Sequence, residues 1–137
     1  MDPHLSIAHA FLASAFQQKG MFDKSIDESQ KAMEFLDSSP SRIALLGYAY
    51  AVAGKRREAQ QTLIRLKTQS PQLYIPPYQT ALVYAGLGQQ DEAFDWLEKA
   101  FQERSWMMAF LKVDPRWDVL RSNPRFTDLL RRTGLAA

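Results

Sequence analysis

Three fourteen-residue stretches decide the fold: LASAFQQKGMFDKS at residues 12–25, LGYAYAVAGKRREA at 46–59 and TALVYAGLGQQDEA at 80–93. Each has a small residue at its second position, an aromatic residue at its fifth, a glycine at its ninth and a small residue at its last. Successive stretches begin 34 residues apart. A period of this length, kept by several residue types at once, is typical of arrays built from pairs of antiparallel helices.

The repeated positions have physical explanations. Apolar residues such as Leu46 and Tyr50 recur at helical spacing before the glycine and predict the first helix of each pair. We expect Gly20, Gly54 and Gly88 to end that helix, because glycine adopts the left-handed conformation that closes such a turn. The small residues allow neighbouring helices to approach closely. Because neither helix buries its apolar face alone, successive units are expected to stack and share one core.

Proline and serine clusters mark the breaks between the helices, as at Ser38-Ser39-Pro40 and Pro76-Pro77. The units fall at about residues 6–39, 40–73 and 74–107, within a single all-α domain that covers residues 1–137. Their helices are predicted over residues 4–19, 22–37, 41–53, 56–69, 76–87 and 90–104.

The C-terminal segment carries a degenerate fourth unit. Its turn falls at Ser122, which lies 34 residues after Gly88, but Pro115 interrupts the helix that would precede it. Because the end of such an array must face water, we expect an atypical capping unit at residues 106–137. It is predicted to contain short helical pieces at 106–112 and 115–121 and a closing helix at 124–132. Its apolar side is predicted to be Trp106, Phe110, Leu111, Trp117, Leu120, Phe126, Leu129 and Leu130.

The three repeated units resemble the tetratricopeptide repeat family over about residues 6–105. The second unit departs from the family pattern mainly at Leu66, and the third has Pro77 and Thr80 at two early positions. The resemblance implies a right-handed superhelical array of three units and a cap, which binds proteins or peptides and is not an enzyme. The matching residues of the second unit are Ile43, Leu46, Gly47, Tyr50, Gly54, Ala59, Leu63 and Pro71.

The tail has a narrower resemblance, which rests on FLKVDPRW at 110–117 and NPRFTDLLRRTGL at 123–135. It is similar to the C-terminal end of repeat arms in bacterial signalling proteins, such as serine/threonine kinases, nucleotide cyclases and winged-helix regulators. None of those catalytic or DNA-binding domains is present in this sequence. The resemblance implies a sensing or docking arm of a bacterial signalling protein.

The family resemblance also implies a candidate binding surface on the concave face, which the first helix of each unit lines. Its exposed positions are mostly apolar here, and an exposed apolar groove usually marks a binding site. We expect a protein or peptide partner, such as an amphipathic helix. The alternative is homo-oligomerisation through the groove or the cap, and both uses can share the surface. The predicted groove residues are Ile7, Ala10, Phe11, Ser14, Ala44, Leu45, Tyr48, Tyr78, Gln79 and Leu82.

Some family members hold the terminal carboxylate of a peptide with lysine and asparagine side chains on this face. The matching positions here are Ala10, Ser14 and Leu45, so a bound carboxylate would lack charge-assisted hydrogen bonds. We expect no carboxylate clamp.

The composition excludes several kinds of catalytic and metal site. Without cysteine, the chain has no disulfide framework, zinc knuckle or thiol nucleophile. His4 and His9 are five residues apart, which places them on different faces of a helix and excludes a metal pair. The sequence has no Gly-rich phosphate loop and no serine elbow. We expect no enzymatic activity and no cofactor.

The net charge of +2 and the pI near 9.0 are too mild to indicate nucleic acid or an anionic membrane as partner. Residues 104–137 carry +4 and residues 1–103 carry −2, which favours an acidic partner or end-to-end docking of copies. A solvated cap with cations near helix ends explains the same asymmetry. The apolar runs fall short of the roughly 20 residues that span a bilayer, and no export signal is evident. We expect a cytoplasmic protein.

Overall fold

The structure is a computed structural model that describes residues 12, 15–16, 19–35, 40–68 and 74–135. All regular secondary structure within these residues is helical, which confirms the all-α class. The helices are α2 (Phe22–Phe35), α3 (Pro40–Val52), α4 (Arg56–Thr68), α5 (Pro77–Gly86), α6 (Gln90–Gln102), the 3-10 helices η1 (Trp106–Phe110) and η2 (Pro115–Leu120), and α7 (Pro124–Arg132).

Each of these helices begins and ends within two residues of its prediction. Four helices begin with a proline in their first turn, where its missing N–H would have no intrahelical partner: Pro40, Pro77, Pro115 and Pro124. Most of the predicted first helix, 4–19, lies outside the described residues, but Leu12, Ala15 and Phe16 are helical.

The three repeated glycines form turns of the same backbone geometry. Gly20, Gly54 and Gly88 have φ angles of 74°, 80° and 78°. In each turn, the N–H that follows the glycine donates to the carbonyl oxygen of the repeated aromatic residue. These hydrogen bonds satisfy helix-end carbonyl groups in the Schellman arrangement, so the 34-residue period corresponds to one repeated turn. The donor–acceptor pairs are Met21 and Phe16 at 2.8 Å, Lys55 and Tyr50 at 2.9 Å, and Gln89 and Tyr84 at 2.9 Å.

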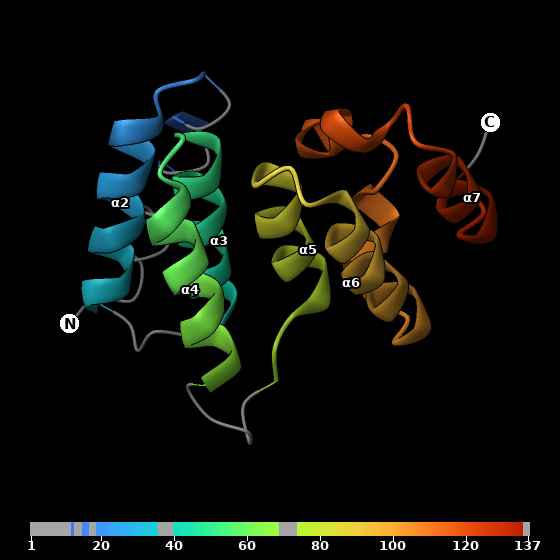
Figure 1. Cartoon of the computed structure of the whole chain (residues 1–137), viewed down its shortest axis with the longest axis horizontal. Coiled ribbons are helices and arrows are strands. Elements are labelled where there is room, and N and C mark those ends of the chain that lie inside the picture. Colours follow the sequence, from blue (N-terminus) through green and yellow to red (C-terminus); the bar gives the residue numbers. More distant parts are fainter. Residues whose placement is uncertain (1–11, 13–14, 17–18, 36–39, 69–73, 136–137) are drawn as a thin grey trace. The chain divides into compact units, whose positions relative to one another are not determined.

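The chain forms two compact units, residues 1–75 and 76–137, and each is described by itself. In the first unit, α3 packs against both α2 and α4 (Figure 1). Ile26 of α2 and Leu46 and Ala49 of α3 form a buried cluster, against which Tyr50 packs. The Tyr50 hydroxyl accepts a hydrogen bond of 2.9 Å from the side chain of Gln30 on α2. The repeated aromatic position therefore ties α3 to α2.

In the second unit, α5 packs against α6 and η2, and α7 packs against α6 (Figure 1). The predicted cap thus covers this helix pair. The predicted burial of two of its residues is wrong, however, because Trp106 and Phe110 are exposed. Met108, which the prediction leaves out, is buried in that segment, and the predicted Leu111 is buried as well. The other buried members of the predicted apolar side are Trp117, Leu120, Phe126 and Leu129.

The turn expected at Ser122 has a different construction from the three glycine turns. The side chain of Asn123 accepts a hydrogen bond of 2.9 Å from the backbone N–H of Arg125, and this caps α7. Within the described ranges, the non-glycine residue with a positive φ is Arg104, at 55°, rather than a residue near 122. At this position the structure therefore has an asparagine cap followed by a proline in place of a glycine turn.

The glycine turns can be tested at Gly88, where a Cβ atom would meet nothing within 4 Å. The cost of Gly88→Ala is then the left-handed backbone alone, and we expect the free energy of unfolding to fall by about 1–2 kcal/mol. Urea unfolding followed by circular dichroism measures it. Gly88→Asn is the control, because asparagine tolerates this conformation better and should lose less. Equal losses for both variants would show that the conformation is not the cause.

Candidate partner-binding site

The predicted groove residues do not form an exposed apolar surface among the described residues. Ala44 and Tyr48 on α3 are buried, as are Tyr78 and Leu82 on α5. Their expected exposure is wrong because α3 and α5 each pack between two other helices and are apolar on nearly every side. Leu45 and Gln79 are partly exposed, and Ile7, Ala10, Phe11 and Ser14 lie outside the described residues.

Gln79 differs from its neighbours on α5. Its side-chain oxygen is buried and accepts no hydrogen bond from the described residues. The rest of the side chain is partly exposed. The role of Leu45 and Gln79 in binding stays a prediction.

Tyr78 is only 1% exposed and holds the cap onto α5. Its hydroxyl donates a hydrogen bond of 2.8 Å to Asp114 Oδ2 and accepts one of 2.7 Å from Trp117 Nε1. The Tyr78 and Trp117 rings also meet edge to face, with centroids 5.1 Å apart. Burial raises the pKa of Tyr78, so its hydroxyl stays protonated. The residue is a structural anchor rather than a groove residue.

Asp114 accepts most of its remaining hydrogen bonds from Arg116. Arg116 Nε and Nη2 donate to the two carboxylate oxygens at 2.9 and 2.7 Å, and the backbone N–H of Arg116 donates at 3.0 Å. Burial alone would raise the pKa of Asp114, but the hydrogen bonds and charge of Arg116 outweigh it, and the pKa lies below 3.8. The carboxylate is thus saturated by its partners and unsuited to acid–base chemistry near neutral pH.

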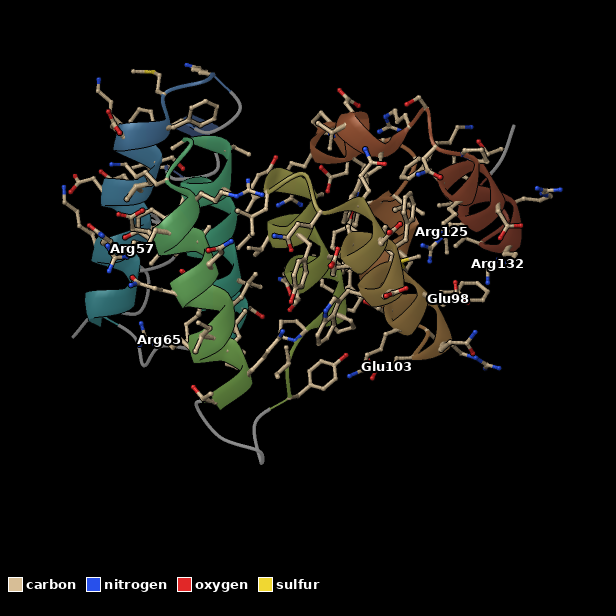
Figure 2. The ribbon with its side chains drawn as sticks, in the orientation of Figure 1. Arg57, Arg65, Glu98, Glu103, Arg125 and Arg132 are labelled. Atoms are coloured by element: carbon tan, nitrogen blue, oxygen red, sulfur yellow. The ribbon has the colours of Figure 1, made fainter. Side chains whose placement is uncertain are left out.

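A groove of about 210 Å³ lies between α6 and α7, with Phe94 and Leu129 among its lining residues. Its charged residues are already paired across the two helices. Arg132 donates to both carboxylate oxygens of Glu98, at 2.8 and 2.7 Å (Figure 2). Arg125 lies 3.4 Å from Asp95. The hydrogen bonds from Arg132 lower the pKa of Glu98. This groove fastens α7 to α6 and offers no unpaired charge to a ligand.

Arginine–aromatic contacts reinforce the same attachment. The Arg125 guanidinium lies 4.9 Å from the centre of the Phe94 ring, and that of Arg132 lies 5.0 Å from the centre of the Phe101 ring. Cation–π contacts of this kind contribute about 0.5–1 kcal/mol each at exposed sites. Arg125 and Arg132 therefore stabilise the packing of α7 against α6.

The strongest candidate for binding is an exposed apolar surface at η1, which we call the cap ridge: Trp106, Phe110 and Val113. These side chains are 73%, 49% and 70% exposed. Trp106 and Phe110 meet edge to face, with ring centroids 5.9 Å apart. The N–H of Val113 donates to the Phe110 carbonyl at 3.1 Å. Residues three apart in such a turn lie on the same side, so the three side chains form one surface.

The cap ridge is the outward face of a segment that is apolar on both faces. Met108 and Leu111, which alternate with the ridge residues, are buried. The Ser105 hydroxyl oxygen accepts a hydrogen bond of 3.3 Å from the Met107 N–H and so caps η1. The core needs only the inward set, so the outward set remains available to a partner. Sequence reasoning missed this surface by assigning Trp106 and Phe110 to the core.

The described residues contain no group of three histidine, cysteine, aspartate or glutamate side chains that could hold a metal ion. None of the helices in these residues is both long enough and apolar enough to cross a membrane. Comparisons with protein-family models, with curated proteins and with solved structures returned no match.

The Tyr78 cluster can be tested by Tyr78→Phe, which removes one hydroxyl and leaves the buried Trp117 N–H without an acceptor. A buried polar group that loses its partner costs about 1–3 kcal/mol, and we expect urea unfolding to show a loss of this size. Tyr74→Phe is the matched control, since Tyr74 is exposed and water can replace any bond its hydroxyl loses. A loss no larger than that of the control would contradict the anchoring role.

The same cluster predicts a pH dependence of stability. The pKa of Asp114 is lower in the folded chain than its ordinary value of 3.8. Its contribution to stability is therefore complete above pH 3.8 and is lost as the pH falls through the folded pKa. We expect urea unfolding to show that Asp114→Asn is less stable than the wild type at pH 7, with a difference that shrinks as the pH approaches 2.

The control for this pH series is Asp118→Asn, which changes an exposed carboxylate four residues away. Its difference from the wild type should change less over the same range. A constant difference between Asp114→Asn and the wild type from pH 7 to pH 2 would contradict the assignment.

Proposed function

We propose that this chain is a non-catalytic scaffold for protein interactions. It is built as a tetratricopeptide-type array and serves as the docking arm of a bacterial signalling protein in the cytoplasm. The recurrence of one turn at Gly20, Gly54 and Gly88 supports the array. So do the packed helix pairs, α3 with α4 and α5 with α6. In this proposal the partner is a peptide segment that binds to the cap ridge.

The observation that carries the proposal is the exposure of Trp106 and Phe110 next to each other. Large aromatic side chains contribute a disproportionate share of the energy of protein interfaces. An exposed apolar cluster is also a common mark of a binding site. The ridge is thus the surface of the described residues that is best suited to a protein partner.

The support beneath the ridge adds to its suitability. Met108 and Leu111 anchor the segment from inside, and Asp114 is held by Tyr78 and Arg116 directly after it. Binding to a surface held in this way costs less conformational entropy than binding that must first order a mobile loop. The T-shaped contact between Trp106 and Phe110 restricts the rotation of the two rings, which lowers this entropy cost further.

The shape of the ridge suggests how a partner segment lies on it. The Trp106 and Phe110 rings are in contact, and Val113 lies one turn after Phe110. Because these side chains protrude, the partner must provide the complementary depression. The apolar face of an amphipathic helix, with gaps between its own side chains, meets this requirement.

A display library of random 16-residue peptides tests the proposal. We expect peptides enriched on the wild type to bind at least about 30-fold more weakly to the double variant Trp106→Ser and Phe110→Ser, as for the loss of an interface anchor. The free energy of unfolding should change by less than about 0.5 kcal/mol per substitution, since both side chains are exposed. Fluorescence anisotropy of a labelled enriched peptide measures the affinity.

The matched control is Ile64→Ser, which removes an apolar side chain of 61% exposure from α4. It should leave the affinity unchanged. Equal binding by the double variant and the wild type would remove the ridge from the proposal. Sedimentation at the same concentrations tests the self-association alternative. A dimer that disappears in the double variant would support that alternative, although three side chains offer much less than the roughly 800 Å² per partner of a stable interface.

A further inference from the structure

The turn that leads into the cap ridge contains an arginine where the chain otherwise uses glycine. Arg104 has a φ of 55°, and the N–H of Ser105 donates to the Ala100 carbonyl at 3.0 Å. The same bond, five residues back along the chain, closes the turns at Gly20, Gly54, Gly88 and Gly134. An L side chain is less favourable than glycine in this conformation. This turn therefore holds an arginine side chain in a backbone conformation that glycine would adopt with less strain.

The cations of the tail fall into two groups. Five of the seven form ion pairs: Arg116 with Asp114, Arg121 with Asp118, Arg125 with Asp95, Arg131 with Asp128, and Arg132 with Glu98. Arg104 and Lys112 are exposed, and neither has an ion pair with any residue in the described part of the chain. Of the positive charges in residues 104–137, which carry a net charge of +4, these two are therefore the most accessible to a partner.

Both available cations adjoin the ridge in sequence. Arg104 lies two residues before Trp106, and Lys112 lies between Phe110 and Val113. Two acids are close in sequence. Asp114 is occupied by Arg116 and Tyr78. Glu103, Arg104 and Lys112 together carry a net charge of +1. The ridge is thus an apolar surface whose neighbours in sequence carry a net positive charge.

We propose that the ridge binds an acidic amphipathic segment of a protein, whose apolar side chains cover Trp106, Phe110 and Val113. Carboxylates of that segment would face Arg104 and Lys112. This inference rests on the proposed function and specifies its partner. A carboxylate at arginine forms charge-assisted hydrogen bonds, which are stronger than neutral ones. Charges at the border of an interface act mainly on partner choice, association rate and salt dependence.

The first test is the composition of the peptides that the display library enriches on the wild type. We expect net negative sequences in which acidic residues flank apolar residues at helical spacing. Neutral or basic sequences would overturn the acidic partner while leaving the proposed function in place. Failure to enrich any peptide would instead count against the proposed function itself, and hence against the inference built on it.

The second test compares Arg104→Gly and Lys112→Ser with the wild type, using one enriched acidic peptide. Each variant should bind about 2- to 5-fold more weakly at low salt, which is the usual scale for one exposed ion pair. The decrease in affinity with added salt should also be less steep than in the wild type. Arg57→Ser is the matched control, because Arg57 is an exposed arginine on α4 (Figure 2). It should bind the peptide as the wild type does.

Arg104→Gly has a readout that separates binding from folding. Because glycine suits the left-handed turn, its Tm should rise by about 2–5 °C while its affinity for the peptide falls. A gain in stability with a loss of binding cannot be caused by unfolding. Should this variant fold less well than expected, Lys112→Ser tests the same charge border without changing the turn. Wild-type affinity in both variants would overturn the inference.

An anionic lipid surface is the competing partner for an apolar ridge with cations at its border. Co-sedimentation with vesicles of phosphatidylserine and phosphatidylcholine tests it. We expect no binding beyond that of the variant Trp106→Ser. Binding to these vesicles that requires Trp106 and Arg104, together with no preference for acidic peptides, would replace the protein partner with a membrane.

Discussion

Helix pairs in this chain depend on one backbone turn, in which a left-handed residue lets the next N–H reach the carbonyl oxygen five residues before it. Glycine takes the left-handed position at 20, 54, 88 and 134, and Arg104 takes it after α6. Because this turn ends a helix within two residues, it brings the next element directly beside the last helical turn. The repeat length, the helix boundaries and the start of the cap ridge all follow from where the turns occur.

The helix boundaries could be predicted because their signals act over a few residues. Pro40, Pro77 and Pro124 begin helices, and the glycines end them. Side-chain burial depends on partners far along the chain, which local signals do not identify. The hydrogen-bond partners of Tyr78 follow it by 36 and 39 residues, at Asp114 and Trp117. In the sequence, a buried anchor such as Tyr78 is therefore indistinguishable from an exposed groove residue.

Two tryptophans of the cap illustrate the same limit. Trp106 and Trp117 both belong to short 3-10 helices in a segment rich in apolar residues. The Trp117 indole N–H finds the Tyr78 hydroxyl, and its ring is buried, whereas Trp106 packs against Phe110 and remains exposed. One signal was present in the sequence: between 106 and 113 the only polar residue is Lys112. A helical segment with one buried face does not need so many apolar residues. The apolar residues beyond that need, Trp106, Phe110 and Val113, form the ridge.

The charged residues near the cap ridge bear on which surfaces the ridge can contact. The terminal unit of a helical array is expected to present a polar outer face, yet the outer face of residues 106–113 is apolar. Without charged neighbours, such a surface would associate with any other apolar surface, including a second copy of itself. Arg104 and Lys112 disfavour a second copy, since like charges would meet at the same border. The other tail arginines are already paired with Asp114 or with acids of α6, η2 and α7. In the proposed binding mode, the border cations therefore act against self-association and favour a partner of opposite charge.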